Sequence, residues 1–159
     1  MTSQLTIRRL TNLDENFWCS DLVPSATHLD FENTFKKIII EEQQDKSYSF
    51  ILESNGESVG FIQVFNVLRY PACSGMIEIM ISGSKRKLGY AKKGITLLED
   101  FCFKDLGLMR LIAPISPGND GSIALFTSLS YHKYFTDPSA FFFNKKPAAH
   151  EIWVKIKPE

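Results

Sequence analysis

The amino-terminal part of the chain begins with a strand-like pattern and then turns helical. Apolar and polar residues alternate over residues 5–10, which predicts a first strand. Residues 12–23 are typical of a short helix that has Asp14 near its start. Residues 30–45 place apolar side chains at the i, i+4, i+7 and i+8 positions of an amphipathic helix, with Asp30 as the expected N-cap. The apolar face of this helix consists of Phe31, Phe35, Ile38 and Ile39.

The central part returns to strand periodicity. Two strand-like stretches, residues 47–53 and 58–66, flank the pair Asn55-Gly56, which readily adopts the positive φ angles of a tight hairpin turn. A further apolar strand is expected over residues 75–82. These three strands are therefore expected to follow one another through hairpins.

The carboxy-terminal part mixes helices and strands. Residues 95–108 carry an apolar helical stripe, and Gly107 is a natural C-cap. Residues 109–116 are typical of a buried strand, which fits a parallel crossover from the strand before the helix. A turn and a short helix are expected over residues 117–131, and residues 150–157 alternate like a last strand. The helical stripe consists of Ile95, Leu98, Phe101 and Cys102.

The order of these elements predicts the fold class. The order is β-α-α-β-β-β-α-β-α-β-β. The three Phe of residues 141–143 are expected in a strand at the core edge or in a substrate wall. The fold class is therefore mixed α/β (α+β), with a central sheet of about seven strands flanked by about four helices. A chain of 159 residues without internal repeats or low-complexity linkers is expected to form a single domain, residues 1–159.

Composition excludes several classes of protein. Hydrophobic residues make up 44% of the chain and charged residues 23%, which is typical of a globular protein. The 18 Lys and Arg residues equal the 18 Asp and Glu residues, so a chain-wide basic field for nucleic acid is not expected and an anion site must be local. No apolar run approaches the length of a membrane span, and the opening residues lack the apolar stretch of a signal peptide.

The cysteines and histidines predict no metal site. Cys19, Cys73 and Cys102 are scattered, odd in number and without CxxC spacing, so neither a disulfide framework nor a zinc site is indicated. The three histidines are equally dispersed: His28, His132 and His150. A cytoplasmic, reduced and metal-free protein is the expectation.

Residues 84–94 concentrate cations between the strand over residues 75–82 and the helix that follows. The N-terminus of a helix offers free N–H groups and the positive end of its dipole, and small residues let a phosphate approach. The segment suits a pyrophosphate; the alternative is a solvated basic patch, which is the better interpretation for Lys92 and Lys93 alone. Cations at a helix N-terminus oppose the helix dipole, so a structural role poorly explains the five basic residues of this segment. They are Lys85, Arg86, Lys87, Lys92 and Lys93.

The pattern R-x-x-G-x-A in this segment resembles the acetyl-CoA pyrophosphate loop, Q/R-x-x-G-x-G/A, of the GNAT N-acetyltransferases. Arg86, Gly89 and Ala91 fill its fixed positions, and the G-x-G-x-x-G and Walker A patterns are absent. Residues 119–131 are similar to the family's "N…S…L…LGF" segment. The matching residues are Asn119, Ser122, Leu129 and Tyr131. The opening strand and the hairpin resemble those of the ribosomal-protein N-terminal acetyltransferase (RimJ/RimL-like) branch, so the resemblance covers nearly the whole chain.

The resemblance implies acetyl-CoA as a co-substrate and assigns residues to it. The fourth and fifth strands would splay apart so that pantetheine pairs with the backbone of Ile79, Met80 and Ile81, and one N–H there would polarise the thioester carbonyl. Asn119 would contact the cofactor; the alternative is that Asn119 is a turn residue before a helix. Ser122 would lie beside the cofactor. The pyrophosphate loop would consist of Arg86, Lys87, Leu88, Gly89, Tyr90 and Ala91. The family often has Gly where Lys87 stands.

Acetyl transfer to an amine needs a proton acceptor and stabilisation of the carbonyl oxygen and of the leaving thiolate. Glu78 is the one charged residue in an apolar strand, so a raised carboxyl pKa and a role as general base are expected. The equally supported alternative is a Glu that faces solvent or pairs with a Lys. Ser122 would hydrogen-bond the thiolate, or else cap a helix. Tyr131 is a fallback donor, although packing in the core is the stronger interpretation. Many family members carry a Tyr general acid where this chain has Phe126.

The leading hypothesis is an acetyl-CoA-dependent N-acetyltransferase that moves the acetyl group to a primary amine by direct attack on the thioester. The acceptor, a protein N-terminus or a small-molecule amine, stays open, as does the choice between monomer and homodimer. Neither nucleic acid nor a membrane is expected as a partner. The missing Tyr supports a second hypothesis, a catalytically weak acyl-CoA-binding sensor or interaction protein. A third, an anion-binding protein unrelated to acetyl transfer, is disfavoured by the full-length resemblance.

Overall fold

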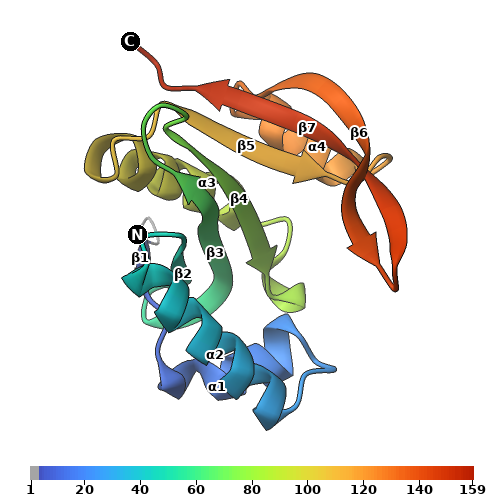
Figure 1. Cartoon of the computed structure of the whole chain (residues 1–159). Helices are drawn as coiled ribbons and strands as arrows, with labels where there is room; N and C mark the ends of the chain where they lie inside the picture. Colours follow the sequence, from blue (N-terminus) through green and yellow to red (C-terminus); the bar gives the residue numbers. More distant parts are fainter. Residues whose placement is uncertain (1–3) are drawn as a thin grey trace.

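The computed structural model describes residues 4–159 and arranges them around a seven-stranded sheet (Figure 1). The strands are β1 (Leu5–Arg9), β2 (Tyr48–Ser54), β3 (Glu57–Leu68), β4 (Ser74–Ile81), β5 (Arg110–Ile115), β6 (His132–Phe143) and β7 (Lys146–Ile156). The α-helices are α1 (Glu15–Phe17), α2 (His28–Gln43), α3 (Tyr90–Asp100) and α4 (Asp120–Ser128). Short 3-10 or π-helical turns adjoin them at Asn12–Asp14, Trp18–Leu22, Gly83–Lys85 and Phe101–Asp105.

The strands lie in the order β1-β2-β3-β4-β5-β7-β6. Neighbouring strands are antiparallel except for β4 and β5, which are parallel and joined through α3. The predicted turn between β2 and β3 is present, with φ of 52° at Asn55 and 80° at Gly56. The predicted mixed fold of seven strands and four helices is therefore confirmed.

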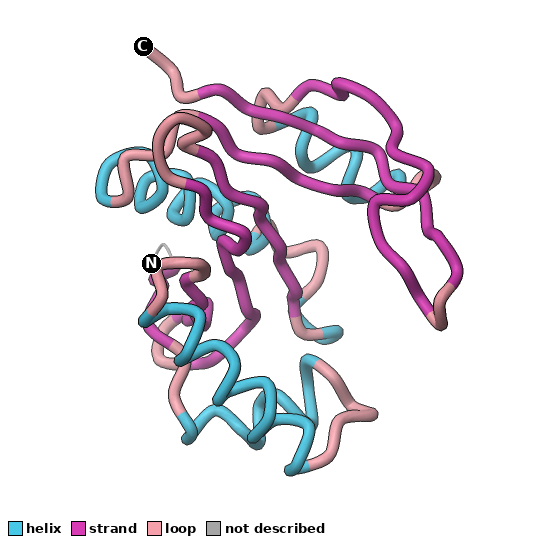
Figure 2. The backbone as a smooth tube through the Cα atoms, in the orientation of Figure 1, coloured by secondary structure: helices cyan, strands magenta, loops and turns pink. Residues whose placement is uncertain are grey.

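β4 and β5 pair over a short stretch and then separate. The paired positions are Ser74 with Arg110, Gly75 with Leu111 and Met76 with Ile112. β4 continues from Ile77 to Ile81 with β3 along one edge and, within the described residues, no strand along the other. Figure 2 shows the two strands diverging. The splay expected between the fourth and fifth strands is therefore present.

Alternating side chains of β2 and β3 divide between two cores on opposite faces of the sheet. The core beneath α3 includes Phe50, Leu52, Ile62, Ile95 and Leu98. The core beneath α2 includes Trp18, Phe31, Ile38, Ile51 and Phe61. The two faces differ beyond β4, where α2 does not continue over β5, β6 and β7 (Figure 1).

The start of α2 differs from the expectation. The N-cap is Thr27 rather than Asp30, and Asp30 lies in the first turn and completes a capping box. The Asp30 amide donates to Thr27 Oγ1 at 3.2 Å, and the Thr27 amide donates to Asp30 Oδ2 at 2.7 Å. The expected apolar face is also narrower than the sequence predicts, because Phe31 and Ile38 are buried whereas Ile39 is 37% exposed.

Candidate active site

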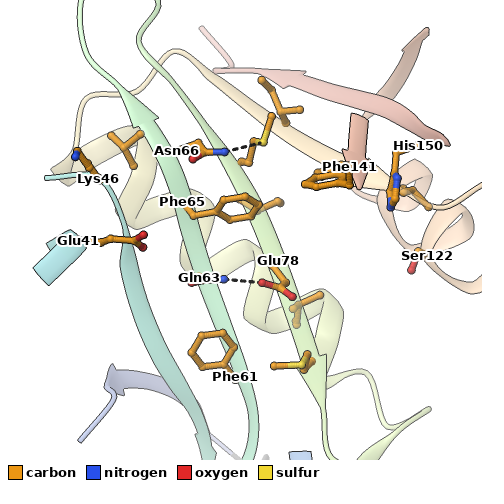
Figure 3. A pocket seen from close by; sticks show the side chains of 18 of the residues that line it. Glu41, Lys46, Phe61, Gln63, Phe65, Asn66, Glu78, Ser122, Phe141 and His150 are labelled. Carbon is orange, nitrogen blue, oxygen red and sulfur yellow. Dashed lines mark hydrogen bonds between the residues drawn. The ribbon is translucent and has the colours of Figure 1, made fainter. Parts of the chain in front are cut away.

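A cavity of about 1090 Å³ occupies the splay between β4 and β5 (Figure 3). Its wall includes Met76, Glu78 and Met80 from the α2 face of β4 and Ile77 and Ile79 from the α3 face. Further wall residues come from α2, β3, β5, α4 and the β6–β7 hairpin. The cavity therefore opens to both faces of the sheet, because a gap in a sheet joins the spaces on its two sides.

The predicted pyrophosphate loop lies between β4 and α3. Gly89 has a φ of +82° and occupies the N-cap position of α3, where no side chain caps the helix. A Cβ atom added at Gly89 would meet no atom within 4 Å, so the space in front of the helix start is open. Lys87 also has a positive φ, of 63°, at the position where the family often has Gly. Uncapped N–H groups facing open space fit an anionic ligand.

The basic side chains of this loop are not equivalent. Lys85 Nζ lies 2.8 Å from Glu57 Oε2, and this hydrogen bond raises the pKa of Lys85. Arg86 Nε donates to the carbonyl oxygen of Ile81 at 3.3 Å, which ties the loop to the end of β4. Lys87 and Leu88 are exposed. Lys85 is thus engaged with a carboxylate, whereas Lys87 is open to solvent.

Glu78 lies on the α2 face of β4 and is held by a cross-strand neighbour. It pairs in register with Gln63 of β3, whose Nε2 donates to Glu78 Oε2 at 2.5 Å (Figure 3). Gln63 Oε1 in turn accepts from Ser49 Oγ at 3.2 Å. Glu78 is exposed to solvent, which agrees with the solvent-facing alternative and not with desolvated, apolar surroundings. The chain from Ser49 through Gln63 orients the carboxylate at the cavity wall.

The backbone of Ile79, Met80 and Ile81 lines the open edge of β4. These residues pair with β3 on one side, and their side chains are half-buried. Successive residues of a strand direct their N–H and C=O groups to opposite edges. Part of this backbone therefore faces the gap, where an extended ligand can pair with it.

Asn119 and Ser122 meet at the start of α4, and both line the cavity. Asn119 is the N-cap of α4, and its Oδ1 accepts from the Ser122 amide at 3.2 Å. The capping role considered for Ser122 therefore belongs to Asn119. Figure 3 shows the Ser122 side chain across the gap from Glu78 of β4.

Tyr131 belongs to the core rather than to the cavity wall. It is 1% exposed and packs edge-on against Phe126, with ring centroids 5.0 Å apart. Phe126 lines the cavity and Tyr131 does not. Burial, followed by the charge of Glu99, raises the pKa of the Tyr131 hydroxyl. The packing interpretation of Tyr131 agrees with this burial, whereas the fallback role as a catalytic donor does not, because the hydroxyl is buried.

The structure adds residues that the sequence did not single out. His150 of β7 lines the cavity, and its Nε2 lies 3.2 Å from Ser116 Oγ at the end of β5. Phe141 of β6 packs edge-on against the His150 ring at 4.7 Å, and Phe143 is also in the wall. Phe142 lies between them and outside the wall, so the substrate-wall interpretation fits two of the three consecutive Phe. His150 and Ser116 are 34 residues apart, so only the β5–β7 register brings them together.

A model of the family described as Acetyltransferase (GNAT) domain matches residues 4–132. The chain belongs to this family. This membership confirms the family that the loop motif predicted.

Solved structures of other proteins share the fold. RimJ from Mycobacterium smegmatis, in complex with CoA-disulfide, is similar with a TM-score of 0.86 and 17% identity, over 96% of this chain and 81% of that chain. Spermidine N-acetyltransferase from Vibrio cholerae, in complex with CoA and spermine, has a TM-score of 0.79 and 18% identity, over 96% of this chain and 95% of that chain.

A curated relative is similar over a shorter stretch. It is "Probable N-acetyltransferase YjcK" from Bacillus subtilis (strain 168), 21% identical over 94 residues. The match covers 59% of this chain and 52% of the relative, so the chain spans about half the length of that protein.

Two kinds of feature are not found in residues 4–159. No group of three or more His, Cys, Asp or Glu side chains is arranged to hold a metal ion. None of the helices in this part of the chain is both long and apolar enough to cross a membrane.

Proposed function

We propose that this GNAT domain transfers an acetyl group from acetyl-CoA to a primary amine by direct attack of the amine on the thioester. The observation that carries the proposal is the cavity through the β4–β5 splay, which opens to both faces of the sheet. A donor entering from the α3 side and an acceptor entering from the α2 side would meet at β4. No acyl-enzyme intermediate is needed when both substrates reach one gap.

The donor would be held by backbone groups at two places. The loop at the start of α3 would bind the pyrophosphate through its N–H groups, with Gly89 leaving the space open. The open edge of β4 would pair with the pantetheine arm, and Asn119 would contact the arm from α4. The loop residues in this role are Arg86, Lys87, Leu88, Gly89, Tyr90 and Ala91, and those of β4 are Ile79, Met80 and Ile81.

The acceptor would be prepared by Glu78 and the leaving group by Ser122. An amine is protonated near neutral pH and must lose a proton before it attacks. Glu78 lines the α2 side of the cavity and is oriented by Gln63, so its carboxylate would take that proton directly or through water. The Ser122 hydroxyl would hydrogen-bond the thiolate as the carbon–sulfur bond breaks.

The acceptor side of the cavity favours a peptide N-terminus over a polyamine. A polyamine carries several positive charges and needs several carboxylates. Glu41 of the cavity wall is already engaged, because it lies within 3.7 Å of Lys37 and accepts a hydrogen bond from Ser47 at 3.2 Å. Lys37, Lys46 and Arg110 add cations to the same wall. The wall also contains aromatic side chains, Phe61, Phe65, Phe141 and Phe143, which suit an apolar residue beside the amine. These features support the ribosomal-protein N-terminal acetyltransferase (RimJ/RimL-like) branch.

A thiol-release assay tests the proposal. Acetyl-CoA would be mixed with the protein and with a panel of short peptides with free N-termini, spermidine, amino acids and amino sugars. We expect the fastest thiol release with peptides, and acetyl-CoA binding by calorimetry. Absence of binding would remove the cofactor assignment, and faster release with spermidine than with every peptide would remove the acceptor assignment.

The acyl-CoA sensor is the second candidate, and Phe126 in place of the family's Tyr favours it. The same assay separates the two, because a sensor binds acetyl-CoA without releasing thiol in the presence of any amine.

The three cysteines are free thiols, which supports a reducing compartment such as the cytoplasm as the place of action.

A further inference from the structure

His150 lies on the wall of the cavity that faces β4. Figure 3 shows His150 and Phe141 on one side of the gap and Glu78 on the strand across it. The imidazole is half-buried, and Phe141 packs edge-on against it with ring centroids 4.7 Å apart. Phe141 therefore covers one side of the imidazole.

The contacts of His150 assign its two nitrogens. Nδ1 lies 3.4 Å from the carbonyl oxygen of Ala148, which only accepts, so Nδ1 carries the hydrogen. Nε2 lies 3.2 Å from Ser116 Oγ and is then free to accept the Ser116 hydroxyl hydrogen. Ser116 is exposed and lines the cavity beside Asn119. The pair therefore forms a path for a proton from the cavity to the imidazole.

Neighbouring charged groups do not occupy this path. Asp137, the cross-strand partner of His150 on β6, accepts from the amide two residues further on at 2.9 Å. Glu151, next on β7, pairs with Lys133 at 2.7 Å. Glu78 belongs to the facing strand. Among the described residues, Ser116 is the side chain that hydrogen-bonds the imidazole.

We infer that Ser116 and His150 form a proton relay between the attacking amine and the leaving thiolate, in the place of the Tyr that Phe126 replaces. This inference rests on the proposed function and deepens it. An alkylammonium acceptor loses two protons on the way to an amide. Glu78 takes the first one, which makes the amine neutral, and the relay moves the second.

The amine nitrogen forms a bond to the thioester carbon, and its remaining excess proton passes to Ser116 Oγ as the Ser116 hydroxyl proton passes to His150 Nε2. The carbon–sulfur bond breaks with both electrons on sulfur. The imidazolium returns its proton through Ser116 to the thiolate, and the exposed Glu78 releases its proton to water. The turnover therefore ends with an amide, a free thiol, neutral His150 and ionised Glu78.

Kinetics of four variants test the relay, with the best amine acceptor of the wild-type protein and with acetyl-CoA as donor. His150→Ala and Ser116→Ala should each lower kcat by about 100-fold, the loss typical of a missing acid–base group, with little change in the KM for acetyl-CoA. Because both residues serve one path, the double variant should be no slower than the slower single variant. His132→Ala is the matched control, since His132 is exposed on β6 and outside the cavity wall, and its kcat should stay at the wild-type value.

Chemical rescue separates a proton relay from a packing role. His150→Ala leaves a space beside Phe141, and added imidazole should restore part of its kcat, whereas it should not affect Ser116→Ala. A wild-type kcat in Ser116→Ala, a multiplicative loss in the double variant, or no rescue of a folded His150→Ala would overturn the relay. If His150→Ala fails to fold, Ser116→Ala alone decides, because it removes only an exposed hydroxyl. A wild-type protein that binds acetyl-CoA but acetylates no amine defeats the proposed function itself.

Discussion

Arg8 on β1 and Asp14 in the following helical turn form a two-pronged ion pair. Nη1 and Nη2 of Arg8 lie 2.9 and 2.7 Å from the two carboxylate oxygens of Asp14. Asp14 is 5% exposed and also accepts from the Thr11 amide at 2.9 Å. The pair fixes the helical segment before α2 against the edge of the sheet.

Asp14 should contribute stability that depends on pH. Burial by itself would raise the pKa of Asp14, but the hydrogen bonds from Arg8 and Thr11 lower it overall. The folded pKa therefore lies below the unfolded value of about 3.9. Ionised Asp14 stabilises the fold above that value, and the contribution is lost as the pH falls through the folded pKa.

Asp14→Asn should lower the free energy of unfolding by roughly 1–3 kcal/mol at neutral pH, because Arg8 loses its charged partner. Urea unfolding at neutral pH and below about pH 4 would show this difference shrinking in acid. Asp100→Asn removes an exposed ion pair with Lys104 and should have little effect at either pH. An equal loss at both pH values would contradict the role of the Asp14 charge.

Gly89→Glu should abolish acetyl-CoA binding. The new side chain meets no protein atom at its Cβ, so its effect comes from a carboxylate placed where the pyrophosphate would lie and from the strained φ of +82°. Calorimetry would measure the affinity. Gly56→Glu is a matched control, with a φ of +80° and equally open space at the β2–β3 turn. Retained affinity in a folded Gly89→Glu protein would move the pyrophosphate away from this loop.

Glu78→Gln should lower kcat by about 100-fold while the affinity for acetyl-CoA stays unchanged. Glutamine keeps the shape and an oxygen for the Gln63 amide but cannot accept a proton at that oxygen. Steady-state thiol release would measure the change. Glu32→Gln, on the exposed side of α2 beside Lys36, is the control. Turnover at the wild-type rate would show that water, and not Glu78, takes the proton.

Ser122→Ala and Asn119→Ala should separate catalysis from helix capping. Asn119 caps α4, so its loss should lower the free energy of unfolding by about 1 kcal/mol. Ser122→Ala should leave stability unchanged and lower kcat, because the thiolate loses its donor. Thermal unfolding and thiol release on the same two preparations would measure both effects. A stability loss in Ser122→Ala without a change in kcat would return Ser122 to a structural role.

The sequence predicts the elements well where the signal is local. Asn55-Gly56 specifies a turn through its own φ angles, and the loop with Gly89 lies within one short segment. The cap of α2 is the instructive error. Thr27 and Asp30 form one capping box, so both residue types point to a helix start and the pattern alone does not say which one is the N-cap.

The parts of the site that sequence reasoning missed depend on register. Glu78 stands opposite Gln63 because of the β3–β4 pairing, which replaces the expected apolar surroundings with a polar chain. His150 reaches Ser116 because of the β5–β7 pairing. Neither partner is encoded by spacing along the chain, and a shift of one residue in either pairing would turn the side chain to the other face.

The divergence of β4 and β5 would link the stability of the protein to its proposed donor. An extended donor arm that pairs with the free edge of β4, as proposed, would act as an additional strand and complete the sheet. Above its dissociation constant, each tenfold increase in donor concentration would then add about 1.4 kcal/mol to the free energy of unfolding. Resistance of this protein to heat and to proteases should therefore rise and fall with the acetyl-CoA concentration around it.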